Sequence, residues 1–234
     1  MNKVVALAVS DLKITARRGE AVILNLVVPT IVLIALAQTS AGIEKALPFA
    51  YLQVVLATSM VSLGIMTGFD RRFRVLVRLG TTPLGRKGLV YSKNFSMLVI
   101  QTFGIFVLTI VGVALGWQFD SKWLLAIPLC WIASFAFAGI ALLVAGCVKA
   151  EANLGIQNLL YLVMMGVAGI VFAGSKLSGT LQFIIEIIPS GALHTLLRYL
   201  AGVGDFSWVA MVSLVAFSVV LPLLAARKFT FDES

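Results

Sequence analysis

The stretch WLLAIPLCWIASFAFAGIALLVAGCV, Trp123–Val148, contains no charged residue in 26 consecutive positions. An α-helix needs about 20 apolar residues to cross the hydrocarbon core of a bilayer. Lipid offers the backbone no hydrogen-bond partner, so a continuous apolar segment crosses as a helix that satisfies its own N–H and C=O groups. The stretch therefore predicts a transmembrane helix.

Five further segments share this length and apolar character. They are Ala21–Gln38, Phe49–Phe69, Phe95–Trp117, Leu154–Gly174 and Trp208–Ala226. The first begins too far from the N-terminus, and is too long, to be the hydrophobic part of a signal peptide. The chain is 60% hydrophobic and 12% charged, whereas a soluble domain is about 25% charged. We expect an all-α polytopic membrane protein with six transmembrane helices in a single transmembrane domain, residues 1–234.

Fourteen of the 18 Lys and Arg residues fall on one side of the predicted spans. They are Lys3, Lys13, Arg17, Arg18, Arg71, Arg72, Arg74, Arg78, Arg86, Lys87, Lys93, Lys149, Arg227 and Lys228. The other side holds Lys45, Lys122, Lys176 and Arg198. Cytoplasmic segments carry the excess of Lys and Arg, so we expect both termini in the cytoplasm. The net charge of +8 then reflects topology, and we expect no nucleic-acid partner.

The first 20 residues have the pattern of an amphipathic helix. Small and apolar residues between Val4 and Ala16 gather on one face, whereas Lys13, Arg17 and Arg18 lie on the opposite face. Such a helix lies along the membrane surface, where its cations meet anionic lipid headgroups. We predict an interfacial helix over residues 1–20, and the alternative is a solvated basic N-terminus.

Residues 70–94, DRRFRVLVRLGTTPLGRKGLVYSKN, form the longest predicted cytoplasmic connection. Its first part, Phe69–Leu79, predicts a short helix with an apolar face surrounded by arginines. The apolar face consists of Phe73, Leu76 and Val77. Gly80 ends this helix, and Pro83 favours an extended or turn conformation at the residue before it. The shape suits docking on another protein, and the alternative is a basic loop that only fixes the topology.

Residues 175–207 are too apolar for a loop in water. They predict two short helices, Leu181–Ile188 and Ala192–Leu200, broken at Pro189-Ser190-Gly191. Neither is long enough to cross the bilayer, so we expect a re-entrant or interfacial hairpin on the outer side. The hairpin carries three ionisable side chains, Glu186, His194 and Arg198. Ionisable groups at membrane depth are functional candidates, although we favour an anchoring role for these three.

Motifs for catalysis and metal binding are missing. The chain has one histidine and two cysteines, Cys130 and Cys147, which both lie in apolar stretches. Gly80 and Gly85 have the spacing of a nucleotide-binding P-loop, but Arg86-Lys87 follows instead of Lys-Ser or Lys-Thr, and there is no room for the required strand. The chain therefore cannot hydrolyse ATP alone. Transporters driven by protons or sodium usually need buried carboxylates, and their scarcity here favours an external energy source.

The order of these segments resembles the permease subunit of ABC-2 type ABC transporters, an exporter class for drugs, lipids and polysaccharides. The resemblance covers nearly the whole chain as an architecture, and its most specific local match is LGTTPL, Leu79–Leu84. It implies that Val4–Arg18 is an elbow helix. It also implies that Asp70–Leu84 is a coupling helix that seats in a cleft of the ATPase, and that Thr180–Leu200 shapes an outer gate.

The resemblance also assigns residues and partners. The coupling residues would be Arg71, Arg72, Arg74, Arg78, Thr82, Pro83 and Leu84, and the outer-gate residues Glu186, Pro189, His194 and Arg198. It implies a separate ATPase that binds ATP and Mg²⁺, and a second permease copy or paralogue. From the residues themselves we expect contact with membrane lipid, and the compact size and absence of a targeting sequence favour a bacterial plasma membrane. Many family members carry acidic residues in the coupling region, whereas this chain has Asp70 alone among arginines.

Several alternatives stay open on the residues alone. A secondary transporter or channel-like protein would need an essential carboxylate in the membrane, and Glu186 is the nearest candidate. A membrane enzyme acting on lipids would need paired aspartates or a histidine cluster, which the sequence does not offer. The substrate, the direction of transport and the choice between homodimer and heterodimer are not determined by these residues.

Overall fold

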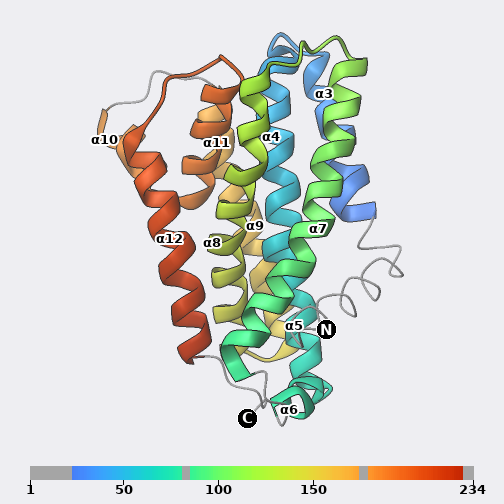
Figure 1. Cartoon of the computed structure of the whole chain (residues 1–234), viewed down its shortest axis with the longest axis vertical. Coiled ribbons are helices and arrows are strands. Elements are labelled where there is room, and N and C mark those ends of the chain that lie inside the picture. Colours follow the sequence, from blue (N-terminus) through green and yellow to red (C-terminus); the bar gives the residue numbers. More distant parts are fainter. Residues whose placement is uncertain (1–22, 81–84, 174–178, 229–234) are drawn as a thin grey trace.

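The computed structural model describes residues 23–80, 85–173 and 179–228, which form a bundle of helices (Figure 1). The elements are η1 (Ile23–Val27), α3 (Val28–Ala37), α4 (Gly42–Leu56), η2 (Ala57–Ser62), α5 (Leu63–Arg72), α6 (Val75–Gly80), α7 (Gly85–Ala114), η3 (Ser121–Leu125), α8 (Ala126–Cys147), α9 (Ala150–Ala173), α10 (Gly179–Ile187), α11 (Pro189–Leu200) and α12 (Trp208–Lys228). No strand occurs within these three ranges, so the predicted all-α class is confirmed.

Five helices are long and apolar enough to cross a membrane. They are Gly42–Arg72, Tyr91–Ala114, Ser121–Cys147, Ala150–Ala173 and Trp208–Lys228. The pair α10–α11 is bent by 103° and is a broken span or a re-entrant loop. The described part of the first predicted span is the shorter apolar helix Asn25–Ala37. The chain is thus a polytopic membrane protein with five or six candidate spans among the described residues.

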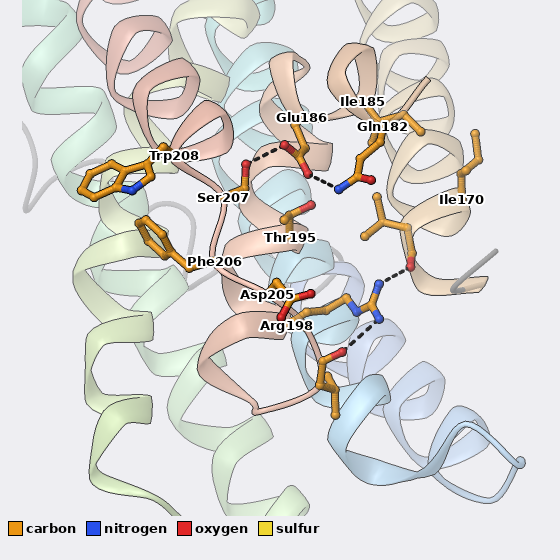
Figure 2. Close-up of a pocket in the computed structure, with 13 residues that line it drawn as sticks. Ile170, Gln182, Ile185, Glu186, Thr195, Arg198, Asp205, Phe206, Ser207 and Trp208 are labelled. Carbon is orange, nitrogen blue, oxygen red and sulfur yellow. Dashed lines mark hydrogen bonds between the residues drawn. The ribbon is translucent and has the colours of Figure 1, made fainter. Parts of the chain in front are cut away.

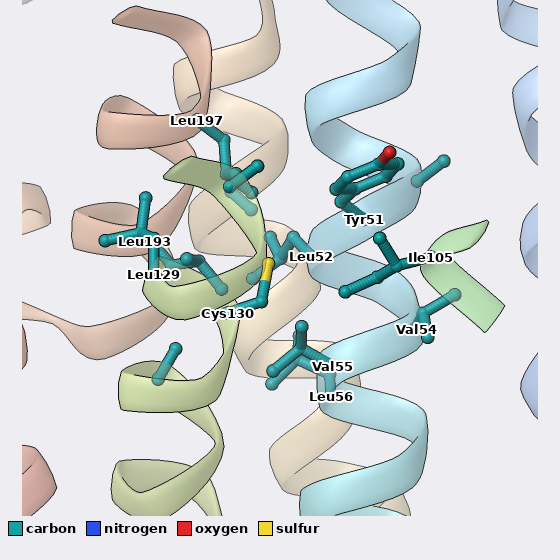
Figure 3. Packing of buried hydrophobic residues seen from close by; sticks show 14 of the residues in the cluster. Tyr51, Leu52, Val54, Val55, Leu56, Ile105, Leu129, Cys130, Leu193 and Leu197 are labelled. Atoms are coloured by element: carbon teal, nitrogen blue, oxygen red, sulfur yellow. The ribbon is translucent and has the colours of Figure 1, made fainter. Parts of the chain in front are cut away.

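The long helix Gly42–Arg72 forms the centre of the bundle. It consists of α4, η2 and α5. Of its most apolar stretch of 18 residues, 78% is buried, whereas only 17% of the corresponding stretch of α9 is buried. Helices α3, α7, α8, α9 and α11 pack around it. In Figure 3, Leu52 and Leu56 of this helix face Cys130 of α8 in a cluster that is closed to the exterior. Because lipid is as apolar as these side chains, their packing stabilises the bundle mainly through close van der Waals contact.

We name the two ends of the bundle after the basic residues at one end and the α10–α11 hairpin at the other (Figure 1). The basic end contains α6, the beginning of α7, the connection between α8 and α9, and the end of α12. The hairpin end contains α10, α11 and the connections 38–41, 115–120 and 201–207.

At the hairpin end, the backbone N–H of Lys122 donates to the Asp120 carboxylate at the start of η3. This hydrogen bond lowers the pKa of that exposed carboxyl.

The helix that contains the third predicted span begins earlier than the sequence indicated. The apolar pattern places the start of the span at Phe95, whereas α7 begins at Gly85 and its candidate span at Tyr91. The second part of the predicted cytoplasmic connection is therefore helical and continuous with the span. Residues 1–22, which include the predicted interfacial helix with Lys13, Arg17 and Arg18, lie outside the described part of the chain.

Candidate functional site

The central helix ends abruptly at the basic end. The backbone N–H of Phe73 donates to the Phe69 carbonyl (2.9 Å) and that of Arg74 to the Arg71 carbonyl (3.0 Å). Arg74 then adopts a left-handed conformation, with φ of 57°. A left-handed residue closes many helices, but it is usually glycine. The predicted uninterrupted helix Phe69–Leu79 is therefore wrong, because the chain turns at Arg74 before it resumes as α6.

This turn divides the predicted apolar face. Leu76 is fully buried, whereas the side chain of Phe73 is 67% exposed and Val77 is also exposed. Arg72 and Arg74 are exposed beside Phe73. The turn between α5 and α6 thus presents an exposed aromatic side chain, flanked in sequence by two exposed arginines, at the basic end.

The predicted coupling arginines have different environments. Arg71 is buried, and its Nη1 donates to the carbonyls of Ala145 (3.0 Å) and Val148 (3.1 Å) at the end of α8. Unpaired carbonyls and the helix dipole both favour a cation at that position. Arg72 forms an exposed ion pair with Glu151 at the start of α9. Arg71 and Arg72 therefore tie the central helix to two neighbours, and Arg74 lies on the turn.

The remaining predicted coupling residues are less fully described. Arg78 lies in α6, but the structure does not describe its side chain. The residues Thr82, Pro83 and Leu84 lie outside the described part of the chain. Their assignment stays a prediction that follows from the resemblance.

A buried ion pair joins α5 to α7, and the sequence did not indicate it. Lys93 Nζ lies 2.6 Å from Asp70 Oδ2, and the two side chains are 1% and 23% exposed. On the sequence, Lys93 counts as a loop cation and Asp70 as a lone acid. A signal was present, because Lys93 lies four and eight residues before Met97 and Gln101, which are both buried on the same helical face.

Amide side chains hold α9 against the central helix. Asn153 Nδ2 donates to the Gly64 carbonyl (2.8 Å), and Gln157 Nε2 donates to the Ala141 carbonyl of α8 (3.0 Å). Gly64 permits this approach, because a Cβ there would lie 2.3 Å from Gln157 Nε2. Hydrogen bonds of this kind between membrane helices contribute about 0.6 kcal/mol each.

A second polar group surrounds η2. Ser59 Oγ donates to Gln101 Oε1 (3.0 Å) and shares a hydrogen bond with Ser134 Oγ, while Ser134 Oγ also lies 3.2 Å from Asn94 Oδ1. All four side chains are buried. A π-helical turn at this position widens the central helix where it meets α7 and α8, and such turns frequently mark functional sites.

At the hairpin end, the chain breaks where the sequence predicted. Ile188 is extended between α10 and α11, and Pro189 is the first residue of α11. Pro189 suits this position, because the first N–H groups of a helix have no partner within it. A Cβ on Gly191 would lie 2.2 Å from the Ile185 carbonyl oxygen, so only glycine allows the two helices to meet this closely.

Glu186 and Arg198 line a cavity of about 820 Å³ beside this break (Figure 2). Glu186 is 6% exposed and accepts hydrogen bonds from Gln182 Nε2 (2.9 Å) and from the Ser207 hydroxyl (2.5 Å). Arg198 donates from Nη1 to the Val171 carbonyl (2.6 Å) and from Nη2 to the Val203 carbonyl (3.1 Å). Two of the four predicted gate residues therefore share one cavity.

His194 and Pro189 do not line that cavity. His194 is fully buried, and its Nδ1 lies 2.9 Å from the Ala168 carbonyl of α9. Since a carbonyl only accepts, Nδ1 carries the proton. The ring packs against Phe49 and Phe172, a structural position that joins α11 to α4 and α9. Among the described residues, no group of three His, Cys, Asp or Glu side chains could hold a metal ion.

The family model described as ABC-2 type transporter matches residues 3–201 of the chain. The chain belongs to the ABC-2 type transporter family. The match includes both the turn at Arg74 and the α10–α11 hairpin, and it ends before α12. No match to the chain was found among curated proteins.

Membership of the ABC-2 family establishes the general role of the chain. It is the membrane domain of an ABC transporter, a multi-pass transport permease that is not itself catalytic. Permeases of this family are generally paired with an ABC ATPase subunit.

Proposed function

We propose that this permease couples to a separate ABC ATPase at its basic end and belongs to an exporter. The observation that carries the proposal is the turn at Arg74, where the side chain of Phe73 is exposed and its two neighbours in sequence, Arg72 and Arg74, are exposed as well. An exposed aromatic residue with arginine neighbours is the composition of an interface centre. ATP and Mg²⁺ would bind to the partner, and ATP hydrolysis would occur there.

The contacts behind this turn suit transmission of a movement into the bundle. Asp70 pairs with Lys93 of α7, Arg71 bonds to the end of α8, and Arg72 pairs with Glu151 of α9. A displacement of α6 would therefore act on the central helix and three neighbours together. Packed helices respond to such displacements by moving between discrete arrangements, here an inward-open and an outward-open one.

A second permease, either a copy or a paralogue, would complete the substrate pathway. The polar residues around η2 give this chain mild hydrogen-bonding capacity in an apolar surrounding. We therefore expect an amphipathic or lipid-like cargo, exported across a bacterial plasma membrane.

Co-purification tests the coupling. The chain is extracted from its native membrane in mild detergent, and the associated ATPase subunit is quantified for wild type, Phe73→Glu and Arg227→Glu. Arg227 is exposed at the same end but lies on α12, so it serves as a matched control. We expect Phe73→Glu to release the ATPase and Arg227→Glu to retain it. Transport by ATP-free vesicles would contradict the proposal.

A further inference from the structure

We propose that the hairpin end binds a phospholipid with a zwitterionic headgroup, taken from the leaflet that surrounds α12. The headgroup would occupy the polar cavity beside α10 and α11, and one acyl chain would lie in an adjoining apolar groove on α12. The proposal concerns the permease itself and does not depend on its coupling to an ATPase.

The polar cavity offers separated charges of both signs. In the described part of the chain, no carboxylate lies within 4.0 Å of the Arg198 guanidinium, whose hydrogen bonds go to the carbonyls of Val171 and Val203. Because these hydrogen bonds go to neutral carbonyls and not to a carboxylate, Arg198 can attract a phosphate. Glu186 and the exposed Asp205 supply negative charge in the same cavity (Figure 2).

The size and donor set of the cavity fit a phosphoethanolamine group. A volume of about 820 Å³ falls within the range of about 300–1,000 Å³ that is typical of small-molecule sites. Each Glu186 oxygen accepts one hydrogen bond from the protein and retains a second lone pair for an ammonium donor. A zwitterion places its phosphate and ammonium on one short chain, which matches Arg198 and Glu186 on the wall of one cavity.

An apolar groove of about 500 Å³ adjoins this cavity. It is lined by Ile187, Trp208, Val209, Val212, Ser213 and Phe217. Its one hydroxyl is already used, because Ser213 Oγ donates to the Ile187 carbonyl (2.6 Å). The groove therefore suits hydrocarbon.

Trp208 connects the two spaces, because it lines both of them. Its side chain is 73% exposed, and indole rings prefer the boundary between headgroups and hydrocarbon. From Trp208 to Phe217, α12 rises about 14 Å at 1.5 Å per residue. This is close to the thickness of one leaflet, about half of 30 Å, so an acyl chain could follow the groove along its length.

The chain contains a second apolar groove that serves as an internal comparison. It lies on α7 and α8, has a volume of about 500 Å³, and includes Phe103 and Trp131. None of its lining residues also lines the polar cavity. Lipid in this groove would therefore be bound without selection for its headgroup.

The test is native mass spectrometry of the complete chain in a neutral maltoside detergent. Dioleoyl phosphatidylethanolamine, dioleoyl phosphatidylglycerol and dioleoylglycerol are added separately at equal concentration. They have the same acyl chains and differ in the ammonium and the phosphate. We expect phosphatidylethanolamine to be retained most strongly and dioleoylglycerol least. Losing one exposed charge partner changes affinity by up to about fivefold, so Asp205→Asn should reduce the preference for phosphatidylethanolamine by up to this factor.

Two further variants complete the design. Trp208→Ala should lower retention of both phospholipids, whereas Phe103→Ala, which shortens an exposed aromatic residue in the groove on α7, should leave it unchanged. Asp205, Trp208 and Phe103 are all exposed, so the substitutions spare the core. Equal retention of the three lipids by wild type, or an equal loss in Trp208→Ala and Phe103→Ala, would overturn the proposal.

Discussion

The basic end and the hairpin end handle their charges in opposite ways. At the basic end, Lys93 pairs with Asp70 and Arg72 pairs with Glu151, each across two helices. At the hairpin end, Glu186 is bonded to neutral side chains and Arg198 to backbone carbonyls. Ion pairs fix helices to one another, and the buried Arg71 does the same through carbonyls at the end of α8. Glu186 and Arg198 instead line a cavity, so their charges stay available to a ligand. The first arrangement suits mechanical transmission and the second suits binding.

The largest effect is expected from the buried ion pair. Asp70→Asn leaves the ammonium of Lys93 buried without its carboxylate, and breaking a buried pair from one side costs about 3–5 kcal/mol. Because the Asp70 side chain is 23% exposed, we expect a loss of about 3 kcal/mol in the free energy of unfolding. Unfolding in dodecyl sulfate, followed by circular dichroism, measures it.

The double variant Asp70→Asn, Lys93→Met supplies the control. It removes both charges, so most of the lost stability should return. If the double variant is less stable than Asp70→Asn alone, the pair is not the reason for the loss.

An effect of about 2 kcal/mol is expected at Arg71. Arg71→Met removes two charge-assisted hydrogen bonds to carbonyls at the end of α8, and a hydrogen bond to a charged group contributes about 1.5–3 kcal/mol. The same unfolding assay measures the loss. Arg71→Lys should retain part of the stability, and a Met variant as stable as wild type would show that the anchor is dispensable.

Gly191→Ala should destabilise the hairpin end by about 1–3 kcal/mol, because its new methyl group would overlap the Ile185 carbonyl. Gly166→Ala in α9 is the matched control, since a Cβ there meets nothing within 4 Å. Thermal unfolding should show a lower melting temperature for Gly191→Ala and an unchanged or higher melting temperature for Gly166→Ala. Equal loss in both would mean that the close contact of α10 and α11 is not required.

The smallest effect concerns the left-handed residue of the turn. Arg74→Gly relieves about 1 kcal/mol of backbone strain, whereas Arg74→Ala removes the same charge and keeps the strain. The glycine variant should therefore be more stable than the alanine variant. Equal stability would indicate that the turn straightens when the arginine is removed.

Sequence reasoning succeeded where the signal is local. Apolar runs identified the spans, because the bilayer demands about 20 consecutive apolar residues wherever a helix crosses. Pro189 identified the break between α10 and α11, because proline begins a helix more readily than it continues one.

Sequence reasoning failed where a partner lies elsewhere in the chain. Lys93 resembles a loop cation until Asp70, 23 residues earlier, is placed beside it. The turn at Arg74 carries no glycine to indicate a left-handed residue. Likewise, Arg198 bonds to the Val171 carbonyl of α9, 27 residues earlier, which no motif links to the hairpin.

Site-specific photocrosslinking tests the central claim, that the turn at Arg74 contacts an ABC ATPase. Benzoylphenylalanine replaces Phe73 or, as the control, Phe103, whose ring is similarly exposed on α7. Illumination in native membranes should link position 73, but not position 103, to a subunit that carries a nucleotide-binding P-loop. If both positions form adducts with lipid alone, the coupling assignment is contradicted.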